Sequence, residues 1–379
     1  MTKHYRVTFS KLFSWKKKSC VASTVTWRKR VNHLGRWECE LSDTDDKQHP
    51  ESLVTSLGKI YRATQNPCSS SPCVSNATCQ PTFLKDESFV CKCPSGFEGH
   101  SCHKAKKGFG LDNPASTCVE VVNETSTAPS GGYFLTTEEG GVQQTYCHMD
   151  IIAGCGEGPW TLIMKISGNQ FKDIELCQSY PWLVRFPFVR YVKDLAAFTL
   201  QTTFHYNSHY WLDKQVYNPD GGLTGFDEIE TKLPSYWSTP FNQMCLGMKS
   251  QGTTNWIRVE SYNTASLYPL LADGNHRPTN TGRNTWKSLL AGSSLQSNCN
   301  MEGFNLNPST YLSRWTAKAR IGILGNNEND CTSCDSRLGF GTGGSYVGMD
   351  DTNSCGNEAL VLADNGNQHI KAHCYILVR

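Results

Sequence analysis

The sequence predicts a mainly β chain with some α+β character, rich in disulfides and divided into a small module and one large domain. Three observations lead to this prediction. Eighteen cysteines occur in 379 residues, and six of them fall within residues 68–102. From residue 118 onward, short apolar and aromatic runs alternate with turns rich in Gly, Asn, Asp and Pro, which is typical of a strand-rich domain. A chain of this length is expected to form two or three domains.

The cysteines also indicate the compartment. Their number is even and their spacing is dense, as in proteins of oxidising compartments, where disulfides persist. Asn-x-Ser/Thr sequons at Asn76 and Asn123 agree with passage through the secretory route. We therefore expect a secreted, extracellular glycoprotein.

The distribution of charged and apolar residues excludes some classes of binding partner. The net charge is only +2, although residues 1–36 hold ten Lys or Arg and no Asp or Glu. This bias is interpreted as a solvated surface, with a polyanion-binding arm as the alternative. No basic stripe interleaved with aromatic residues follows, so nucleic acid is not an expected partner. No apolar stretch is long enough to predict a membrane span.

The first twenty residues lack the apolar run that a signal peptide needs. Because the cysteines predict secretion, we expect that the true N-terminus lies upstream of this sequence. Residues 1–62 agree with that expectation. A strand after Cys20 leading to a Cys-Glu-Leu strand at Cys39 resembles the tail of a PAN/apple-like domain. The alternative is a short hairpin joined by a Cys20–Cys39 disulfide.

Residues 64–103 carry the most specific pattern. Six cysteines are spaced Cys-x4-Cys-x5-Cys-x11-Cys-x-Cys-x8-Cys, and the segment ends in CKCPSGFEGHSC. So short a segment cannot bury a sufficient core, and disulfides must stabilise it. The pattern resembles an EGF-like domain. Among fifteen possible connectivities, the resemblance implies the pairs Cys68–Cys79, Cys73–Cys91 and Cys93–Cys102. Gly96 and Gly99 are expected to supply turns with positive φ.

Further details of this module follow from the same resemblance. Residues 63–67, before the first cysteine, hold no carboxylate, so we expect no calcium in the module. Ser70 matches the O-glucosylation pattern of such modules, and Thr78 matches the O-fucosylation pattern. Thr78 also completes the Asn76 sequon, so N- and O-glycosylation compete there. The alternative is that both patterns arise by chance in a Ser-rich loop.

Residues 104–117 are interpreted as a linker, and residues 118–379 as one large domain. The start of this domain resembles fibrinogen-like domains, most closely the intelectin branch, in its Ser-Gly-Gly-Tyr strand, Tyr-Cys-x-Met segment and GPWTLIMK strand. We expect a turn at Gly140–Gly141, a disulfide Cys118–Cys147 and a strand from Trp160 with at least one buried face. The resemblance returns near the end, at NNENDC, GFGTGG and SCGNEA.

The fibrinogen motifs that build the ordinary ligand pocket are absent, which leaves the sugar specificity open. Taken whole, the order of a PAN-like segment, an EGF module and an intelectin-like domain also resembles skeletal organic matrix proteins of stony corals. That resemblance implies a setting in a biomineralisation matrix.

One late loop holds candidate metal ligands. Residues 326–330 read Asn-Asn-Glu-Asn-Asp, with Asp335, Asp350 and Asp351 nearby in sequence. Carboxylate, amide and backbone oxygens are the ligands that calcium takes. The pattern predicts a calcium site whose ligands include Asn327, Glu328 and Asp330. The alternative is a solvated acidic turn.

Cys331-Thr-Ser-Cys334 is a Cys-x-x-Cys motif without the second pair that a zinc site needs, and its acidic neighbours do not favour redox chemistry. Disulfides from both cysteines to other cysteines are expected instead. Hydrolase and phosphate-binding motifs are absent, so the chain is not expected to be an enzyme.

Two functions are compatible with these observations. The first is a secreted extracellular-matrix binding protein that uses its intelectin-like domain to adhere to glycans or matrix proteins in a calcified skeletal matrix. The second is a structural, disulfide-linked matrix component without a glycan site.

Overall fold

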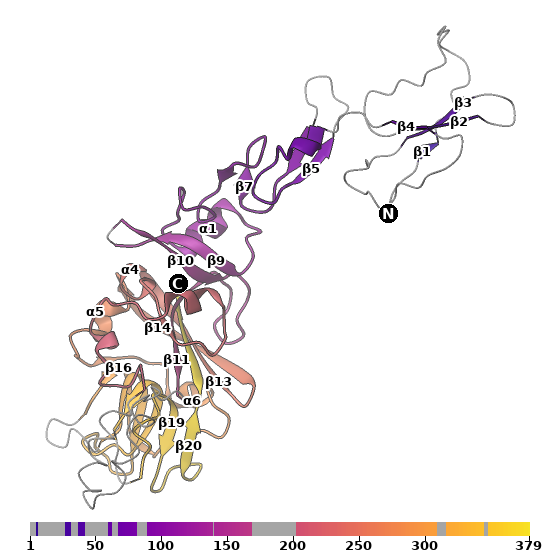
Figure 1. Cartoon of the computed structure of the whole chain (residues 1–379). Helices are drawn as coiled ribbons and strands as arrows, with labels where there is room; N and C mark the ends of the chain where they lie inside the picture. The colour runs from indigo at the N-terminus through magenta and orange to yellow at the C-terminus, as the bar shows by residue number, and fades with distance from the viewer. Residues whose placement is uncertain are drawn as a thin grey trace, which may run out of the picture. The chain divides into compact units, whose positions relative to one another are not determined.

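A computed structural model shows two compact units, Met1–Lys106 and Lys107–Arg379 (Figure 1). It describes residues 67–81, 89–138, 140–168, 202–308, 316–344 and 348–379, and before them the backbone of four strands. The sheets are open, their strands pair antiparallel, and the helices are short. The predicted mainly β, disulfide-rich fold class is therefore confirmed.

The first strands form a four-stranded sheet in the order β1-β3-β2-β4. Strand β3 contains the predicted Cys-Glu-Leu strand and pairs with β2. Cys20, and with it the alternative Cys20–Cys39 disulfide, lies outside the described residues. The bounds of the four strands are Tyr5–Arg6, Trp27–Val31, Trp37–Leu41 and Ile60–Arg62.

The cysteine-rich module consists of a short 3₁₀-helix and two small hairpins. Strand β5 pairs with β6, and β7 pairs with β8. Gly96 and Gly99 have φ values of 90° and 92°, which confirms the predicted positive-φ turns. These elements are Pro67–Ser70 for the 3₁₀-helix and Thr78–Pro81, Phe89–Lys92, Phe97–Glu98 and Lys104–Ala105 for β5 to β8.

The interpretation of residues 104–117 as a linker is wrong. Strand β8 belongs to the cysteine-rich module, and the Lys106 amide donates to the Gly96 carbonyl at 2.8 Å. After it, Ala115 is fully buried and its amide donates to the Phe134 carbonyl at 2.9 Å. The polar composition suggested a linker, but these backbone groups hydrogen-bond to neighbouring strands and are thereby ordered.

The Lys107–Arg379 unit is built around two antiparallel sheets. The first has the order β14-β13-β21-β11-β10-β9, with β12 added beside β11. The β9–β10 hairpin turns at Gly140, whose φ is 75°, as predicted. The strands are β9 Gly131–Thr136, β10 Val142–His148, β11 Trp160–Ser167, β12 Thr231–Lys232, β13 Phe241–Ser250, β14 Thr253–Thr264 and β21 His373–Val378.

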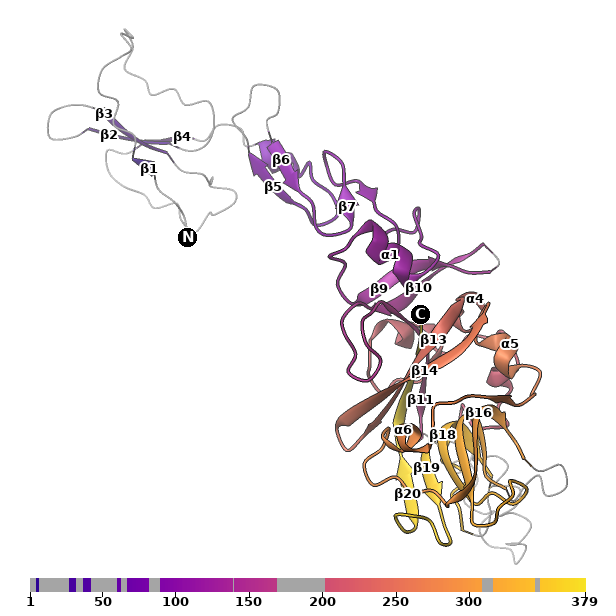
Figure 2. The same ribbon diagram turned by 180° about the vertical axis from the view of Figure 1, so that it is seen from behind.

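The second sheet follows the chain in simple order, β15 to β20. Figures 1 and 2 show it as the orange-to-yellow part of the unit. Its strands are Arg277–Pro278, Asn298–Leu306, Lys318–Asn326, Ser336–Gly343, Cys355–Ala359 and Gln368–Lys371. In its described residues, the helices of the unit are α1 Cys118–Glu124, α4 Ser235–Ser238, α5 Tyr268–Leu271 and α6 Arg283–Lys287, with 3₁₀-helices at His209–Trp211 and Pro219–Leu223.

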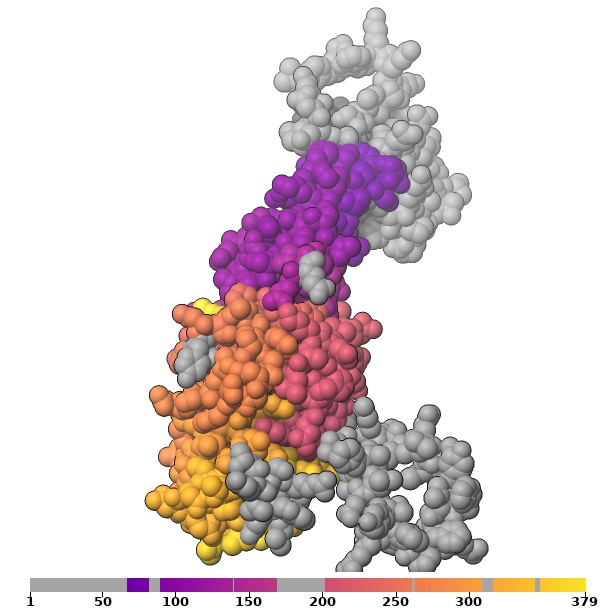
Figure 3. Space-filling view, turned by 90° about the vertical axis from the view of Figure 1, so that its left-hand side faces the viewer, coloured from indigo at the N-terminus to yellow at the C-terminus, as the bar shows by residue number. Residues whose placement is uncertain are grey.

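The main core contains side chains from both sheets. Ile163 of β11, Ile323 of β17 and Ile376 of β21 belong to one buried cluster. All residues of β17, β18 and β19 are buried, so the middle of the second sheet is covered on both faces. In the space-filling view, the segments from residue 202 onward pack against the yellow C-terminal strands as one body (Figure 3).

A row of glycines crosses the second sheet. Gly303, Gly322, Gly339 and Gly356 stand opposite one another on β16, β17, β18 and β19. A Cβ added at Gly339 would lie 2.3 Å from the Ile321 carbonyl oxygen, and one at Gly356 would lie 2.0 Å from that of Ile370. Backbone atoms occupy the space that side chains would need, so only glycine is tolerated in this row.

This packing predicts that Gly339→Ala destabilises the Lys107–Arg379 unit by about 2–3 kcal/mol, because the opposing backbone cannot move aside. Chemical denaturation measures the change. The matched control is Gly131→Ala on β9, where an added Cβ meets nothing within 4 Å and stability should hardly change. Equal stability of the two variants would contradict the interpretation.

Candidate functional site

The cysteine-rich module contains three disulfides. They join Cys68 to Cys79, Cys73 to Cys91 and Cys93 to Cys102, with Cα–Cα distances of 5.8, 5.7 and 5.3 Å. These are the pairs that the EGF-like resemblance implies. Because the module has little buried side-chain area beyond Cys102 and Ala105 in its described part, the disulfides are its principal source of stability.

The predicted glycosylation acceptors of this module lie at its surface. Asn76 and Thr78 are exposed, and Asn76 occupies the left-handed region with φ of 56°. Ser70 is also exposed, and its hydroxyl donates to the Pro67 carbonyl at 3.3 Å. In the second unit, Asn123 is exposed on α1. All four acceptors are therefore accessible, while their modification stays a prediction.

Removing one bridge tests the role of the disulfides. Replacing Cys73 and Cys91 together by Ser should destabilise the module by about 2–5 kcal/mol, because the unfolded chain loses a constraint. Hydrogen exchange should rise sharply over β5 and β6. It should not change over β13 and β21, which belong to the other unit. Unchanged protection of β5 would show that the remaining contacts suffice.

At the start of the second unit, Cys118 of α1 pairs with Cys147 of β10, so the predicted pair is present. Three further disulfides that the sequence did not reveal lie deeper in the unit. They are Cys155–Cys245, Cys299–Cys331 and Cys355–Cys374, whose partners are 90, 32 and 19 residues apart. Nothing in the spacing of these cysteines favours these pairs, because they depend on which strands meet.

The β17–β18 loop holds the residues predicted to bind calcium. Asn327 is half-buried, and its Nδ2 donates to Glu328 Oε1 at 2.8 Å. Asp330 is exposed, and its Oδ1 accepts bonds from the amide and hydroxyl of Thr332, both at 2.7 Å. These bonds hold the pKa of Asp330 below its usual value. The structure thus brings Asn327 and Glu328 together, whereas the Asp330 carboxylate closes a turn of its own.

The other acidic residues near this loop in sequence have separate partners. Asp350 Oδ1 accepts from the Thr352 amide at 2.9 Å, and its Oδ2 pairs with Lys371 at 2.9 Å. Asp351 Oδ1 lies 3.1 Å from His205 Nε2. Both carboxylates therefore hold the segment before β19 in place and do not join the β17–β18 loop.

Two buried residues at the base of the loop stand out. Asp335 precedes β18 and is 3% exposed, and Gln296 precedes β16 and is 0% exposed. Among the described residues, neither Asp335 Oδ1 nor Gln296 Oε1 has a hydrogen-bond partner. From the sequence, Asp335 was known only to be close to the candidate ligands along the chain, and nothing indicated Gln296. Gln296 lies near the loop because β16 pairs with β17.

Asp335 is also electrostatically unusual. Burial raises the pKa of its carboxyl to about 6, the Gln296 amide opposes this rise, and the negative charge of Glu328 adds to it. At neutral pH the charged form of Asp335 therefore costs free energy that the neutral form would avoid.

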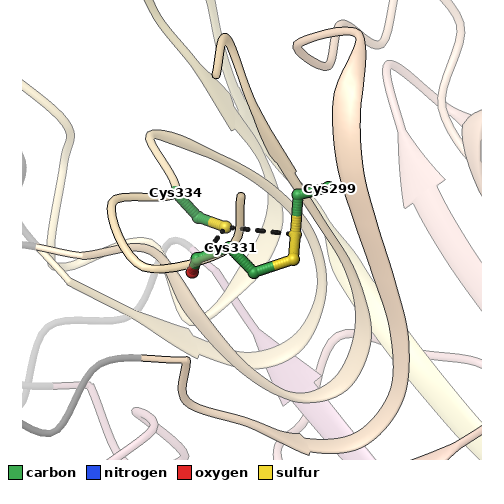
Figure 4. A group of neighbouring side chains, drawn as sticks. All are labelled: Cys299, Cys331 and Cys334. Carbon is green, nitrogen blue, oxygen red and sulfur yellow. Dashed lines mark hydrogen bonds between the residues drawn. A yellow bond between two sulfur atoms is a disulfide. The ribbon is translucent and has the colours of Figure 1, made fainter. Parts of the chain in front are cut away.

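A cluster of three cysteines adjoins the same loop. Cys334 Sγ lies 3.5 Å from Cys299 Sγ, beside the Cys299–Cys331 disulfide, as Figure 4 shows. Within the described part of the chain, Cys334 is the one cysteine without a disulfide, and it is buried. The expectation that both cysteines of the Cys-x-x-Cys motif form disulfides is therefore correct for Cys331 and wrong for Cys334.

The geometry explains this outcome. Cys299 has already paired with Cys331, and the Cys334 thiol donates to the Cys331 carbonyl at 3.3 Å. Burial, together with the charges of Asp335 and Asp330, raises the pKa of Cys334 to about 12. The thiol stays protonated at neutral pH and is a poor nucleophile or metal ligand in this state.

Comparison with known proteins bears on one part of the chain. Residues 68–101 match the EGF-like domain family, so the chain contains an EGF-like domain where the cysteine spacing predicted one. A search of curated proteins finds no match to the chain. An EGF-like domain together with abundant disulfides is characteristic of extracellular proteins, and that is the class to which these features assign the chain.

The absence of calcium expected for this module concerns residues 63–67, of which 63–66 lie outside the described residues. Across the part that the structure describes, no helix is long and apolar enough to cross a bilayer.

The raised pKa of Asp335 predicts a pH dependence. The folded state binds this proton more tightly than the unfolded state, so the added stability is complete below pH about 4 and is lost as pH rises through about 6. A change of about two pKa units corresponds to roughly 3 kcal/mol. The free energy of unfolding, measured in EDTA at pH 4.5 and at pH 7.5, should therefore fall less with rising pH for Asp335→Asn than for the parent protein. An equal fall in the free energy of unfolding for the two proteins would contradict the raised pKa of Asp335.

Proposed function

We propose that the chain is a secreted extracellular-matrix binding protein, in which the Lys107–Arg379 unit binds glycans or matrix proteins. The observation that carries the proposal is the construction of the β17–β18 loop. Glu328, Asn329 and Asp330 are exposed at its tip, and the strands on either side are buried throughout. Polar loops on a rigid scaffold are the usual position of binding residues.

Two disulfides support this construction. Cys299–Cys331 ties the loop to β16, and Cys355–Cys374 ties β19 to β21 of the other sheet. Such constraints reduce the entropy that a loop loses when a ligand binds. The resemblance of the unit to fibrinogen-like and intelectin-like domains points in the same direction, as does the resemblance of the whole domain order to skeletal organic matrix proteins of stony corals.

The proposal is for binding without catalysis. The Cys334 thiol near the loop is held protonated, and Asp330 is engaged with Thr332. Neither group is arranged as a nucleophile beside a general base.

A covalent structural role is the alternative. It would be supported by cysteines available for bonds between chains. Among the described residues, fourteen cysteines pair within the chain and Cys334 is buried. This arrangement favours non-covalent adhesion.

The test is binding of the full chain to a glycan array and to immobilised matrix proteins, in millimolar calcium and in EDTA. We expect binding that Glu328→Ala reduces at least tenfold. The matched control is Glu157→Ala, which removes an exposed glutamate from the β10–β11 loop and should leave binding unchanged. If neither surface retains the protein under either condition, the structural role becomes the better explanation.

A further inference from the structure

Three cysteines beside the β17–β18 loop share a single disulfide. The Sγ atoms of Cys299, Cys331 and Cys334 all lie within 4.8 Å of one another (Figure 4). Cys299 is bonded to Cys331, and the free thiol of Cys334 lies 3.5 Å from Cys299 Sγ. A disulfide bond is about 2.0 Å long, so these last two atoms need to approach by only about 1.5 Å to form one. Cys299 therefore has two sulfur partners within reach.

The backbone at Cys299 is suited to a change of partner. Cys299 lies in a β-bulge of β16, where the register with β17 shifts between Asn298 and Met301. Its φ is 64°, in the left-handed region that residues with a side chain rarely adopt. Bulges turn a side chain out of the regular alternation and are frequent near functional sites. Because Cys299 is outside the regular strand pairing, a change of its side-chain torsion angles leaves that pairing intact.

The two partners are anchored differently. Cys334 is fully buried in an apolar cluster, and its carbonyl accepts from the Ala317 amide at 2.7 Å. Cys331 is half-buried, three residues closer to the exposed tip of the loop. A bond from Cys299 to Cys331 thus holds the loop against β16, whereas a bond to Cys334 would join β16 to a residue that the core already holds.

We propose that this disulfide exchanges, with Cys334 replacing Cys331 as the partner of Cys299. The Cys334 sulfur attacks Cys299 Sγ as a thiolate. The Cys299–Cys334 bond forms as the Cys299–Cys331 bond breaks, and Cys331 leaves as a thiolate that takes up the proton lost by Cys334. One thiol and one disulfide are present before and after the step, so it needs no oxidant or reductant.

The exchange creates a reactive site that the starting form lacks. Cys331 is half-buried, so its thiol is more accessible than that of Cys334 to an alkylating reagent or to a disulfide of another molecule. The exchange also releases residues 327–333 from their covalent link to β16. This behaviour goes beyond the proposed function, because it depends on the three cysteines alone and not on what the loop binds.

The surroundings of Cys334 make the exchange slow at neutral pH. Burial and the charges of Asp335 and Asp330 raise the pKa of its thiol to about 12. The other side chains of its cluster, from β16, β17 and the segments at Met349 and Leu360, are apolar or contain sulfur. Because the thiolate is the attacking form, the rate should rise tenfold for each pH unit below that pKa, or about 100-fold from pH 7 to pH 9.

Alkylation of the native full chain with excess iodoacetamide at pH 7 and pH 9 tests the proposal, with peptide mapping under non-reducing conditions to locate the label and the disulfides. We expect label on Cys331, together with a Cys299–Cys334 disulfide, to accumulate about 100-fold faster at pH 9. The Cys155–Cys245 disulfide, which has no free thiol beside it in the described part of the chain, is the internal control. Both of its cysteines should stay unlabelled.

Two variants make the test specific. Cys334→Ser removes the attacking sulfur and should abolish the labelling of Cys331. Cys331→Ser should fold with a Cys299–Cys334 disulfide. The proposal would be overturned by label on Cys334 alone, by the absence of label from Cys331 at pH 9, or by label on Cys331 that persists in Cys334→Ser. Unpaired Cys299 and Cys334 in folded Cys331→Ser would overturn it as well, and the measurement on the parent chain decides the matter if either variant fails to fold.

Discussion

The Lys107–Arg379 unit depends on the way its chain passes from one sheet to the other at Ala372. This buried residue connects β20, the edge of the second sheet, to β21, which lies between β11 and β13 in the first. The Ala372 amide donates to the Cys355 carbonyl at 3.0 Å, and its carbonyl accepts from Gly168 at 2.8 Å. The Cys355–Cys374 disulfide joins the two sheets at the same place. Because β21 lies between β11 and β13, the first sheet is complete only when this late segment is in place.

The burial of the second sheet explains which residue types its strands contain. Its inner strands are covered on both faces, and large side chains fill one side while a row of glycines lets neighbouring backbones approach. Polar residues in such surroundings must be paired. Arg337, which is fully buried, donates to the Asp350 carbonyl at 2.7 Å and helps to hold the segment before β19. Some buried polar atoms of the described residues nevertheless have no partner, among them Gln296 Oε1, Asp335 Oδ1 and Nε of Arg337 itself.

The cysteines serve two purposes in this fold. In the EGF-like domain they replace a core that so short a segment cannot form. In the second unit they are added to a large core and fix particular connections, such as the β17–β18 loop to β16. Cys334 differs from both groups, because its burial and the nearby carboxylates keep the thiol protonated beside an existing disulfide.

The sequence by itself determined the EGF-like domain, its positive-φ glycines and the β9–β10 hairpin, because each depends on residues close together in the chain. The same local reading failed for residues 104–117, whose polar composition gave no sign that Ala115 would be buried beside β9. Only the tertiary structure decided the Cys155–Cys245 pair, the free thiol of Cys334 and the meeting of Gln296 with Asp335. The physical reason is that these contacts arise from strand pairing and sheet packing between distant segments, which a local pattern of residue types does not specify.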